Sequence, residues 1–401
     1  MKPVKISYLV PAGTGDEEIA KPVIEAFEAA NPGVKVDLQT RPGGADGDNL
    51  VKTKLSTGDM ADVFLYNTGS LLQAIKPAQS LLPADGAWTA DLDKNFVAAA
   101  SVDGKLYASP WGASFGGGIL YNRPIYDKLG LKVPTTWAEF MANNAKIKAA
   151  GITPVEQTFG DTWTSQIIFL GDYHNVEVKE PDFAANYSAG KVKFATDPNG
   201  LLSFQRMEQL AKAGVLNKDF ASAKLNDGLT AVAKGTVAQY PMLAAAAGQI
   251  KTLVPDKIGD VGFFAIPGDD AATNGMTVWL SGGVYIPKTT KGDKLAAAQA
   301  FQAFLTTKDG CDAETKGQAP AGPYMSKPCT LPADVPQWTK DSQVYADAGK
   351  TSTALEFKSP IKGPALEQIL IQVGNGTSSA TKAAENYDKD VVKAREQLGL
   401  K

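Results

Sequence analysis

Short apolar runs alternate with helical patterns over the first 75 residues, and this alternation constrains the fold more than any other feature of the sequence. Runs typical of strands occupy residues 4–10, 34–38 and 63–66. Between the first two, Ile19, Val23 and Phe27 recur every fourth position and would share one face of a helix. A second, shorter helical segment is expected at residues 50–55. Strands and helices that alternate at this spacing predict βαβ units and a parallel sheet.

The segments that follow these strands indicate where a ligand would bind. In an open parallel α/β sheet, ligands bind at the carboxyl ends of the strands. Here those ends lead into residues 11–17, 41–46 and 67–69, which are rich in glycine and polar side chains. Proline is poorly tolerated beyond the first helical turn, so Pro22 predicts a helix that begins at about residues 18–21 and leaves 11–17 as a loop.

The remainder of the chain continues the same style with longer helices. Thr136 and Glu139 have the spacing of a capping box, and Asp197 precedes Pro198 as an N-cap precedes a first-turn proline. Further helices and strands are expected at residues 136–151, 197–214, 261–266, 278–286, 290–305 and 379–398. The 401 residues are enough for two α/β domains.

Composition excludes several classes of function. The chain has one histidine and two cysteines, whereas a structural zinc site usually needs four such ligands, so we expect no metal and no cofactor. A Ser–His–Asp apparatus would have to use His174, whose polar surroundings are typical of an ordinary surface histidine. A formal net charge of −3 argues against a nucleic-acid partner. A pair of carboxylates, as in glycosidases, needs no histidine and remains an alternative.

Cys311 and Cys329 flank a loop-rich segment that contains three prolines. Two cysteines in this arrangement are easily bridged, and such a bridge would stabilise the fold by about 3 kcal/mol. A disulfide would also imply an oxidising, extracytoplasmic compartment. The alternative is two unrelated thiols.

Several aromatic residues lie in or beside polar breaks between the expected elements: Tyr66, Trp111, Trp163, Tyr240 and Trp279. A pyranose ring has apolar C–H faces that stack on aromatic rings, and its hydroxyls need polar partners such as Asn67 and Asp161. These rings therefore favour a sugar ligand. The alternative is that they belong to the core, because aromatic side chains bury well.

Ordered similarities over most of the chain point to one protein family. They are found at residues 24–36, 55–63, 104–110, 120–122, 126–140, 262–268 and 281–288. Through the order and spacing of these segments, the chain resembles the extracellular solute-binding proteins of ABC importers. Within them it resembles the carbohydrate-binding group that includes maltose-binding protein. That group often has a tryptophan a few residues after the position of Tyr240, where this chain has an alanine-rich run at 243–247. The resemblance therefore does not imply maltose as the ligand.

The resemblance implies a two-lobed, periplasmic-binding-protein-like α/β fold, each lobe a mostly parallel sheet flanked by helices. Lobe I would contain residues 1–111 and 279–312, and lobe II residues 112–278 and 313–401. The ligand would lie in a cleft between the lobes, and the chain would cross a multi-strand hinge near 109–114, 272–280 and 311–325.

The resemblance also implies a set of ligand-binding residues and a biological role. Carried over by position, the candidate residues are Asp16, Glu17, Tyr66, Asn67, Trp111, Phe115, Asp161, Trp163, Tyr240, Met242, Trp279, Ser281 and Gly282. The expected function is to bind a mono- or oligosaccharide outside the cytoplasm by lobe closure, as a monomer without catalytic residues, and to deliver it to an ABC importer permease. The protein would be periplasmic or a cell-surface lipoprotein whose leader is absent from this chain. The alternatives are a non-sugar solute bound by the same fold and a glycosidase that uses Glu17 and Asp161.

Overall fold

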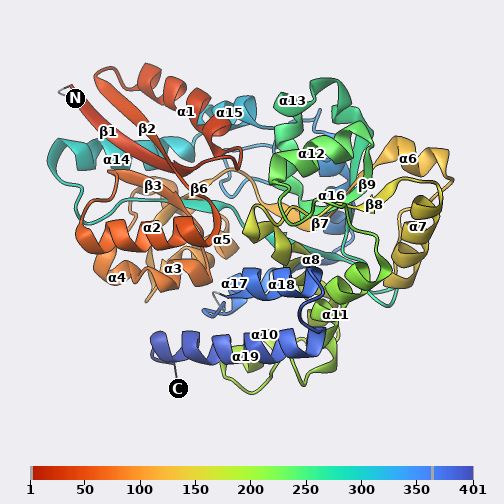
Figure 1. Ribbon diagram of the computed structural model, residues 1–401. Coiled ribbons are helices and arrows are strands. Elements are labelled where there is room, and N and C mark those ends of the chain that lie inside the picture. Colours follow the sequence, from red (N-terminus) through yellow and green to blue (C-terminus); the bar gives the residue numbers. More distant parts are fainter. Residues whose placement is uncertain (1–2, 363–364, 401) are drawn as a thin grey trace. The chain divides into compact units, whose positions relative to one another are not determined.

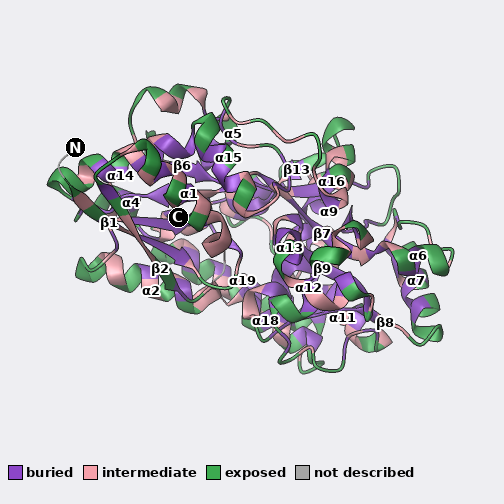
Figure 2. Cartoon of the chain, turned by 90° about the horizontal axis from the view of Figure 1, so that it is seen from above, coloured by how far each residue is buried: buried purple, intermediate pink, exposed green. Residues whose placement is uncertain are grey.

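The computed structural model describes residues 3–362 and 365–400, which fold into two α/β units (Figure 1). Unit 1 comprises the chain up to Ser114 together with Leu280–Val335, and unit 2 comprises Phe115–Trp279 with the chain from Pro336 onward. The chain therefore passes between the units three times. Many of the strands in both units are buried, and buried residues are coloured purple in Figure 2.

Unit 1 is built on a five-stranded sheet in the order β2-β1-β3-β12-β6. Its strands are β1 (Val4–Pro11), β2 (Val34–Arg41), β3 (Val63–Tyr66), β6 (Ala108–Trp111) and β12 (Gly282–Tyr285). β1 pairs in parallel with both β2 and β3, whereas β12 is antiparallel to β3 and β6. Four of the five strands consequently run in one direction, and β12 alone runs against them.

Helices cover this sheet through apolar faces at helical spacing. Ala20, Val23 and Phe27 of α1 (Asp16–Ala30) are buried, and Phe27 meets Phe301 of α14 (Gly292–Leu305) with ring centroids 5.0 Å apart. The other elements of unit 1 are α2 (Gly44–Thr57), α3 (Ser70–Ala74), α4 (Pro77–Ser80), η1 (Ala87–Asp91), α5 (Lys94–Ala99), β4 (Ser101–Val102), β5 (Lys105–Leu106) and α15 (Lys308–Gly317).

Unit 2 is built on a six-stranded sheet in which β7 (Phe115–Asn122) is central. The strand order is β13-β11-β7-β9-β8, and β10 pairs with β7 beyond the end of β11. These strands are β8 (Thr153–Val155), β9 (Val237–Leu243), β10 (Val261–Ala265), β11 (Met276–Trp279) and β13 (Thr351–Thr353). β7 is antiparallel to β9, β10 and β11, and it alone runs against the rest. The reversed strand of unit 2, β7, is the first strand after the chain first crosses from unit 1. The reversed strand of unit 1, β12, is likewise the first strand after the chain returns from unit 2.

A large aromatic core stabilises unit 2. Phe169, Phe194, Phe204 and Tyr387 pack against one another, with Phe169 and Phe204 at a centroid distance of 4.7 Å. The helices of this unit are α6 (Arg123–Lys128), α7 (Trp137–Ala149), η2 (Thr162–Gln166), α8 (Ile167–Gly171), α9 (Tyr173–Glu177), α10 (Phe183–Ser188), α11 (Pro198–Ala213), α12 (Leu225–Lys234), η3 (Ala244–Gln249), α13 (Ile250–Leu253), η4 (Pro255–Asp260), α16 (Gln337–Asp347), α17 (Leu355–Lys358), α18 (Leu366–Gly374) and α19 (Ala380–Gln397).

Local sequence signals are confirmed where they rest on neighbouring residues. Thr136 and Glu139 form the predicted capping box at the start of α7. The Asp197 carboxylate accepts hydrogen bonds from the backbone N–H groups of Asn199 and Gly200, and Pro198 occupies the first turn of α11. The first three strands also lie where the apolar runs predicted them.

The start of α1 was predicted wrongly. The helix begins at Asp16 rather than at residues 18–21, and Pro22 lies within it. Three acidic residues in the first turn favour this start, since they face the positive end of the helix dipole. Burial of the apolar face of α1 offsets the hydrogen bond that Pro22 cannot donate. The loop after β1 is correspondingly shorter than expected, and the second helix, α2, is longer than the predicted 50–55.

The single strand expected at 278–286 is two strands in different units. β11 ends at Trp279 in unit 2, and β12 begins at Gly282 in unit 1, so the chain changes unit between them.

Residues 313–335 were expected in lobe II but belong to unit 1. Backbone hydrogen bonds from Asp93 to the carbonyl of Met325 and from Lys327 to the carbonyl of Asp91, both 2.9 Å, hold the segment there. The last boundary between the units therefore falls after Val335, beyond the expected 311–325.

The predicted disulfide between Cys311 and Cys329 is present, with the two Cα atoms 5.7 Å apart. It joins α15 to the segment that follows it. The bridge adds a covalent tie that helps keep residues 318–329 within unit 1.

Candidate functional site

Seven of the predicted ligand residues meet at one edge of the unit 1 sheet. The register pairs Gly282 with Trp111, Gly283 with Tyr66, and Pro11 with Arg41. The carboxyl ends of β1, β2, β3 and β6 therefore lie beside the start of β12. The seven residues at or next to these strand ends are Asp16, Glu17, Tyr66, Asn67, Trp111, Ser281 and Gly282.

Asp16 is tied to Trp111 at this edge. Its Oδ1 accepts a 2.8 Å hydrogen bond from the Trp111 indole Nε1, and its Oδ2 accepts a 2.6 Å bond from the Thr14 hydroxyl. Burial raises the pKa of Asp16, although these two hydrogen bonds act in the opposite direction. Trp111 is only 5% exposed and meets Tyr8 edge-on, with ring centroids 5.6 Å apart. The Trp111 ring is therefore held in a fixed position within the core of unit 1.

The remaining residues at this edge differ in exposure. Asn67 has an exposed side chain, and its carbonyl accepts a 3.0 Å hydrogen bond from the Tyr285 hydroxyl. Glu17 is half-buried, and its Oε2 accepts from the Gly13 N–H at 3.3 Å. Tyr66 is buried, and so is Ser281, whose carbonyl accepts from the Thr68 hydroxyl at 3.2 Å. Asn67 and Glu17 are thus better placed to meet a ligand than Tyr66 or Ser281.

Arg41 ends β2 at the same edge but is engaged by its own unit. Its Nη1 donates to the carbonyl of Pro42 at 3.0 Å and its Nη2 to the carbonyl of Leu65 at 3.4 Å. Its guanidinium lies 5.7 Å from the centre of the Tyr66 ring, within cation–π range. Burial lowers the pKa of Arg41.

The unit 2 sheet has a corresponding edge. Phe115, the first residue of β7, pairs with Trp279, the last residue of β11. Gly117 pairs with Leu243, where β9 ends, and β8 ends nearby at Val155. The segment that carries Asp161 and Trp163 follows β8.

Two residues predicted to bind ligand at this edge are buried core side chains in unit 2. Tyr240 and Met242 are both fully buried on β9. The Tyr240 hydroxyl forms a 2.6 Å hydrogen bond with the Thr158 hydroxyl. A Cβ atom at Gly228 of α12 would lie 2.7 Å from the Tyr240 ring, so the ring packs directly on that helix. This packing argues against ligand contact, and neither residue is retained as a candidate.

Trp279 and Asp161 have internal partners. The Trp279 indole Nε1 donates to the Glu356 carboxylate, and the ring covers Gly117, where a Cβ atom would lie 2.3 Å from it. The Asp161 Oδ2 accepts a 2.8 Å hydrogen bond from the N–H of Leu225 and so caps the first turn of α12.

Phe115 and Trp163 are the most available rings at this edge. Both are half-buried, and neither takes part in the aromatic pairs recorded among the described residues. Aromatic rings that the protein covers only in part can stack on a ligand.

The candidate residues thus form two groups, one in each unit. A profile of the bacterial extracellular solute-binding protein family matches residues 12–310, about three quarters of the chain. The chain belongs to this family.

Relatives of this solute-binding protein include sugar-binding proteins. The multiple sugar-binding protein of Streptococcus mutans is 29% identical over 297 residues, which cover 72% of this chain and 67% of that protein. The melibiose/raffinose/stachyose-binding protein MelE of Bacillus subtilis is 24% identical over 85% of this chain and 78% of its own length. Binding proteins from Brucella abortus are 32% identical, but the match spans only 34% of their length.

Solved structures of low sequence identity share the fold. A chitin oligosaccharide binding protein superimposes with a TM-score of 0.82 at 22% identity, covering 98% of this chain and 99% of that one. RafE in complex with raffinose gives a TM-score of 0.76 at 22% identity, with 98% and 99% covered. The predicted two-lobed fold class is confirmed.

Family membership makes the chain a binding protein rather than an enzyme, and one that acts outside the cytoplasm. The disulfide agrees with an oxidising compartment. Among the described residues, no helix is long and apolar enough to span a bilayer, and no cluster of side chains could ligate a metal.

His174, predicted to be an ordinary surface histidine, is buried in this solute-binding protein. Its Nδ1 lies 2.9 Å from the Ser352 hydroxyl, and its Nε2 lies 3.1 Å from the carbonyl of Thr273. Burial lowers the pKa of His174. Both ring nitrogens are engaged, so His174 has a structural role that links α9 to the segments around β11 and β13.

Sequence reasoning missed two amide side chains at the unit 2 edge. Gln157 is 1% exposed, and neither its Nε2 nor its Oε1 has a hydrogen-bond partner among the described residues. Its backbone is fixed, because Asn217 accepts from the Gln157 N–H at 2.7 Å and donates to the Gln157 carbonyl at 3.0 Å. Gln166 likewise has a buried Oε1 for which the described part of the chain offers no hydrogen-bond partner. The only sequence signal was their position on either side of Asp161 and Trp163.

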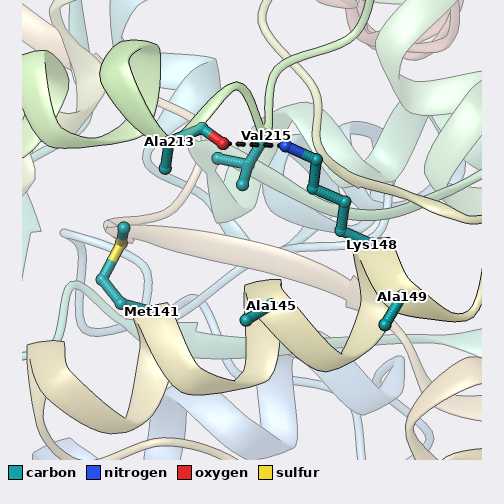
Figure 3. A pocket seen from close by; sticks show the side chains of 6 residues that line it. All are labelled: Met141, Ala145, Lys148, Ala149, Ala213 and Val215. Atoms are coloured by element: carbon teal, nitrogen blue, oxygen red, sulfur yellow. Dashed lines mark hydrogen bonds between the residues drawn. The ribbon is translucent and has the colours of Figure 1, made fainter.

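A surface hollow in unit 2 lies apart from the candidate residues (Figure 3). It has a volume of about 500 Å³ and is lined by α7 and by the end of α11 with the turn that follows. Lys148 crosses it and donates a 2.9 Å hydrogen bond to the carbonyl of Ala213. None of the predicted ligand residues lines this hollow.

Proposed function

We propose that this protein binds a neutral mono- or oligosaccharide outside the cytoplasm and delivers it to the permease of an ABC importer. The observation that carries the proposal is the edge of the unit 2 sheet. There the half-buried rings of Phe115 and Trp163 accompany Gln157, whose amide has no hydrogen-bond partner within residues 3–362 and 365–400. Partly exposed aromatic rings suit the C–H faces of a sugar, and amides suit its hydroxyls.

Unit 1 would supply further polar contacts to the same ligand. Asn67 has a free amide at the sheet edge, and Glu17 offers a half-buried carboxylate. Asp16 accepts from Trp111 and Thr14, and a carboxylate has lone pairs for additional donors. The relatives that bind several sugars or raffinose-type oligosaccharides support this ligand class.

A charged solute is the alternative within the same fold. Such a ligand would need a fixed cation, and Arg41 is a cation that ends β2 at the unit 1 edge. Two of its nitrogens are already bonded to backbone carbonyls, which favours a neutral ligand. A glycosidase using Glu17 and Asp161 is disfavoured, because Asp161 caps α12 and the family consists of binding proteins.

We further propose that the protein acts as a monomer, either free in the periplasm or anchored as a lipoprotein. Its two units would close on the ligand, and the chain segments that join them would serve as the hinge. Closure of this kind is a recurrent transition in two-domain binding proteins.

Intrinsic fluorescence provides the test, since tryptophans accompany the candidate residues in both units. A panel of melibiose, raffinose, stachyose and chitin oligosaccharides should give a saturable change for at least one sugar class. A panel of amino acids and short peptides serves as the control. Saturation by an amino acid or peptide, with no response to any saccharide, would remove the carbohydrate proposal.

A further inference from the structure

Residues 112–114 lead from β6 of unit 1 to β7 of unit 2, and each of them is held by the same part of unit 1. The Gly112 N–H donates to Glu314 Oε1 at 3.2 Å. Ala113 forms an antiparallel bridge with Tyr324. Both the N–H and the hydroxyl of Ser114 donate to the carbonyl of Pro323, at 2.8 and 2.9 Å. We call these three residues the exit segment.

The part of unit 1 that holds the exit segment is itself firmly fixed. Glu314 belongs to α15, and the disulfide ties that helix to the loop that carries Pro323 and Tyr324. The Tyr324 hydroxyl lies 2.7 Å from the Thr315 hydroxyl of the same helix. A Cβ atom at Gly322 would come within 2.5 Å of the Ser114 carbonyl oxygen, so the loop and the exit segment are in close contact.

Glu314 is an unusual side chain for this position, because its surroundings disfavour a charge. It is 3% exposed, and burial raises its pKa to about 8, with the Gly112 N–H acting in the opposite direction. The ionisable groups that interact with it are Tyr8 on β1 and Tyr324 on the loop. Asp16 of α1 acts on the same Tyr8, and Asp312 of α15 acts on Tyr324. All four of these groups are neutral or negative, so none of them would stabilise an ionised Glu314.

We propose that Glu314 is a positioning residue, whose carboxyl holds the exit segment and thereby fixes Trp111 and its hydrogen-bonded partner Asp16 for ligand binding. The proposal rests on the sugar-binding function proposed above. Gly112 directly follows Trp111, and Trp111 is hydrogen-bonded to the candidate ligand residue Asp16. A shift of Gly112 would therefore move Trp111 through the peptide bond that joins them. It would also disturb Asp16 through the hydrogen bond between Trp111 and Asp16.

Ionisation of Glu314 should weaken ligand binding. A carboxylate there is 3% exposed and has one backbone donor to offset its burial, so the charged side chain would move toward water and release Gly112. If only the protonated form is competent, the apparent dissociation constant rises about tenfold between pH 7 and pH 9.

The experiment compares wild type with two variants over this pH range by calorimetric titration with raffinose, stachyose and chitin oligosaccharides. Glu314→Gln keeps an oxygen that accepts from Gly112 and cannot ionise, so its affinity should stay constant. Glu314→Ala lacks the acceptor and should bind weakly at every pH. Glu156→Gln is the matched control, because burial also raises the pKa of Glu156 to about 8, but in unit 2. The dissociation constant of this control should rise about tenfold between pH 7 and pH 9, as in the wild type.

Hydrogen exchange of the free protein, followed by mass spectrometry, tests the positioning role without a ligand. At pH 7, Glu314→Ala should speed exchange in the peptide that contains residues 112–114, and Glu314→Gln should not. A wild-type affinity that is constant from pH 7 to pH 9 would overturn the inference, as would a Glu314→Gln variant with the wild-type pH dependence. Failure of the wild type to bind any saccharide would overturn the proposed function instead, and the exchange experiment would still decide whether Glu314 holds the exit segment.

Discussion

Replacing Glu156 with Gln should stabilise the protein, by an amount that grows with pH. Glu156 directly follows β8, is 4% exposed, and its Oε1 accepts a 3.1 Å hydrogen bond from Asn217 Nδ2. Burial, followed by the charges of Asp219 and Asp227, raises its pKa to about 8. Gln keeps the accepting oxygen and removes the ionisable proton. The substitution therefore removes the titration of the Glu156 carboxyl while it preserves the packing of the side chain.

The sign and size of the effect follow from proton linkage. Glu has an ordinary pKa of 4.5, so between pH 4.5 and pH 8 the unfolded chain has released a proton that folded Glu156 retains. The free energy of unfolding of the wild type therefore falls, as pH rises through this range, by about 1.4 kcal/mol per pH unit on account of Glu156. Glu156→Gln lacks this loss. Its advantage over the wild type should grow from about 1 kcal/mol at pH 5 to about 4 kcal/mol at pH 8.

Urea unfolding at pH 5, 6, 7 and 8, followed by circular dichroism and tryptophan fluorescence, measures this difference. The comparison is made on the transition of unit 2, because the two units need not unfold together. Glu396→Gln on the exposed face of α19 is the control for the same substitution at a surface position. Equal stability differences for Glu156→Gln at pH 5 and pH 8 would refute the reasoning.

Three further outcomes are expected. Replacing Cys311 and Cys329 together with Ser should lower the free energy of unfolding by about 3 kcal/mol in denaturant titrations, and a double variant as stable as the oxidised wild type would contradict this. Trp163→Ala should weaken sugar binding about tenfold in a calorimetric titration, whereas Trp88→Ala, which removes another half-buried ring, should not; equal effects of the two would count against stacking. Gln157→Met should leave the melting temperature of the free protein unchanged or raised, because it removes an amide without partners, and yet reduce sugar affinity; a lowered melting temperature with unchanged affinity would mean that the amide serves the fold instead.

The sequence predicted those parts of the fold that depend on neighbouring residues. The apolar runs of β1, β2 and β3, the capping box of Thr136, and the N-cap at Asp197 are local patterns, and each lies where it was expected. Pro22 was misjudged because the buried face of α1, a tertiary effect, offsets the missing hydrogen bond. The placement of residues 313–335 in unit 1 likewise depends on contacts with Asp91 and Asp93, far away in the sequence.

The sequence predicted which strand ends carry the candidate residues, but not which of their side chains are exposed. Strand ends and their register follow from the order of the elements, so residues such as Trp111 and Gly282 could be assigned to one edge. Whether a side chain at that edge faces outward is a matter of packing. Tyr240 and Met242 lie on the face of β9 that α12 covers, and no local pattern distinguished them from Trp163. Gln157 was missed because the lack of a hydrogen-bond partner is visible only in three dimensions.

Isothermal titration calorimetry of the purified protein decides directly whether it binds a saccharide. Raffinose, stachyose, melibiose and chitin oligosaccharides would be titrated in turn, with amino acids and a short peptide as the competing class. We expect saturable binding at one site per chain for at least one saccharide, and no binding of the charged solutes. Saturable binding of an amino acid or peptide, together with no heat from any saccharide, would contradict it.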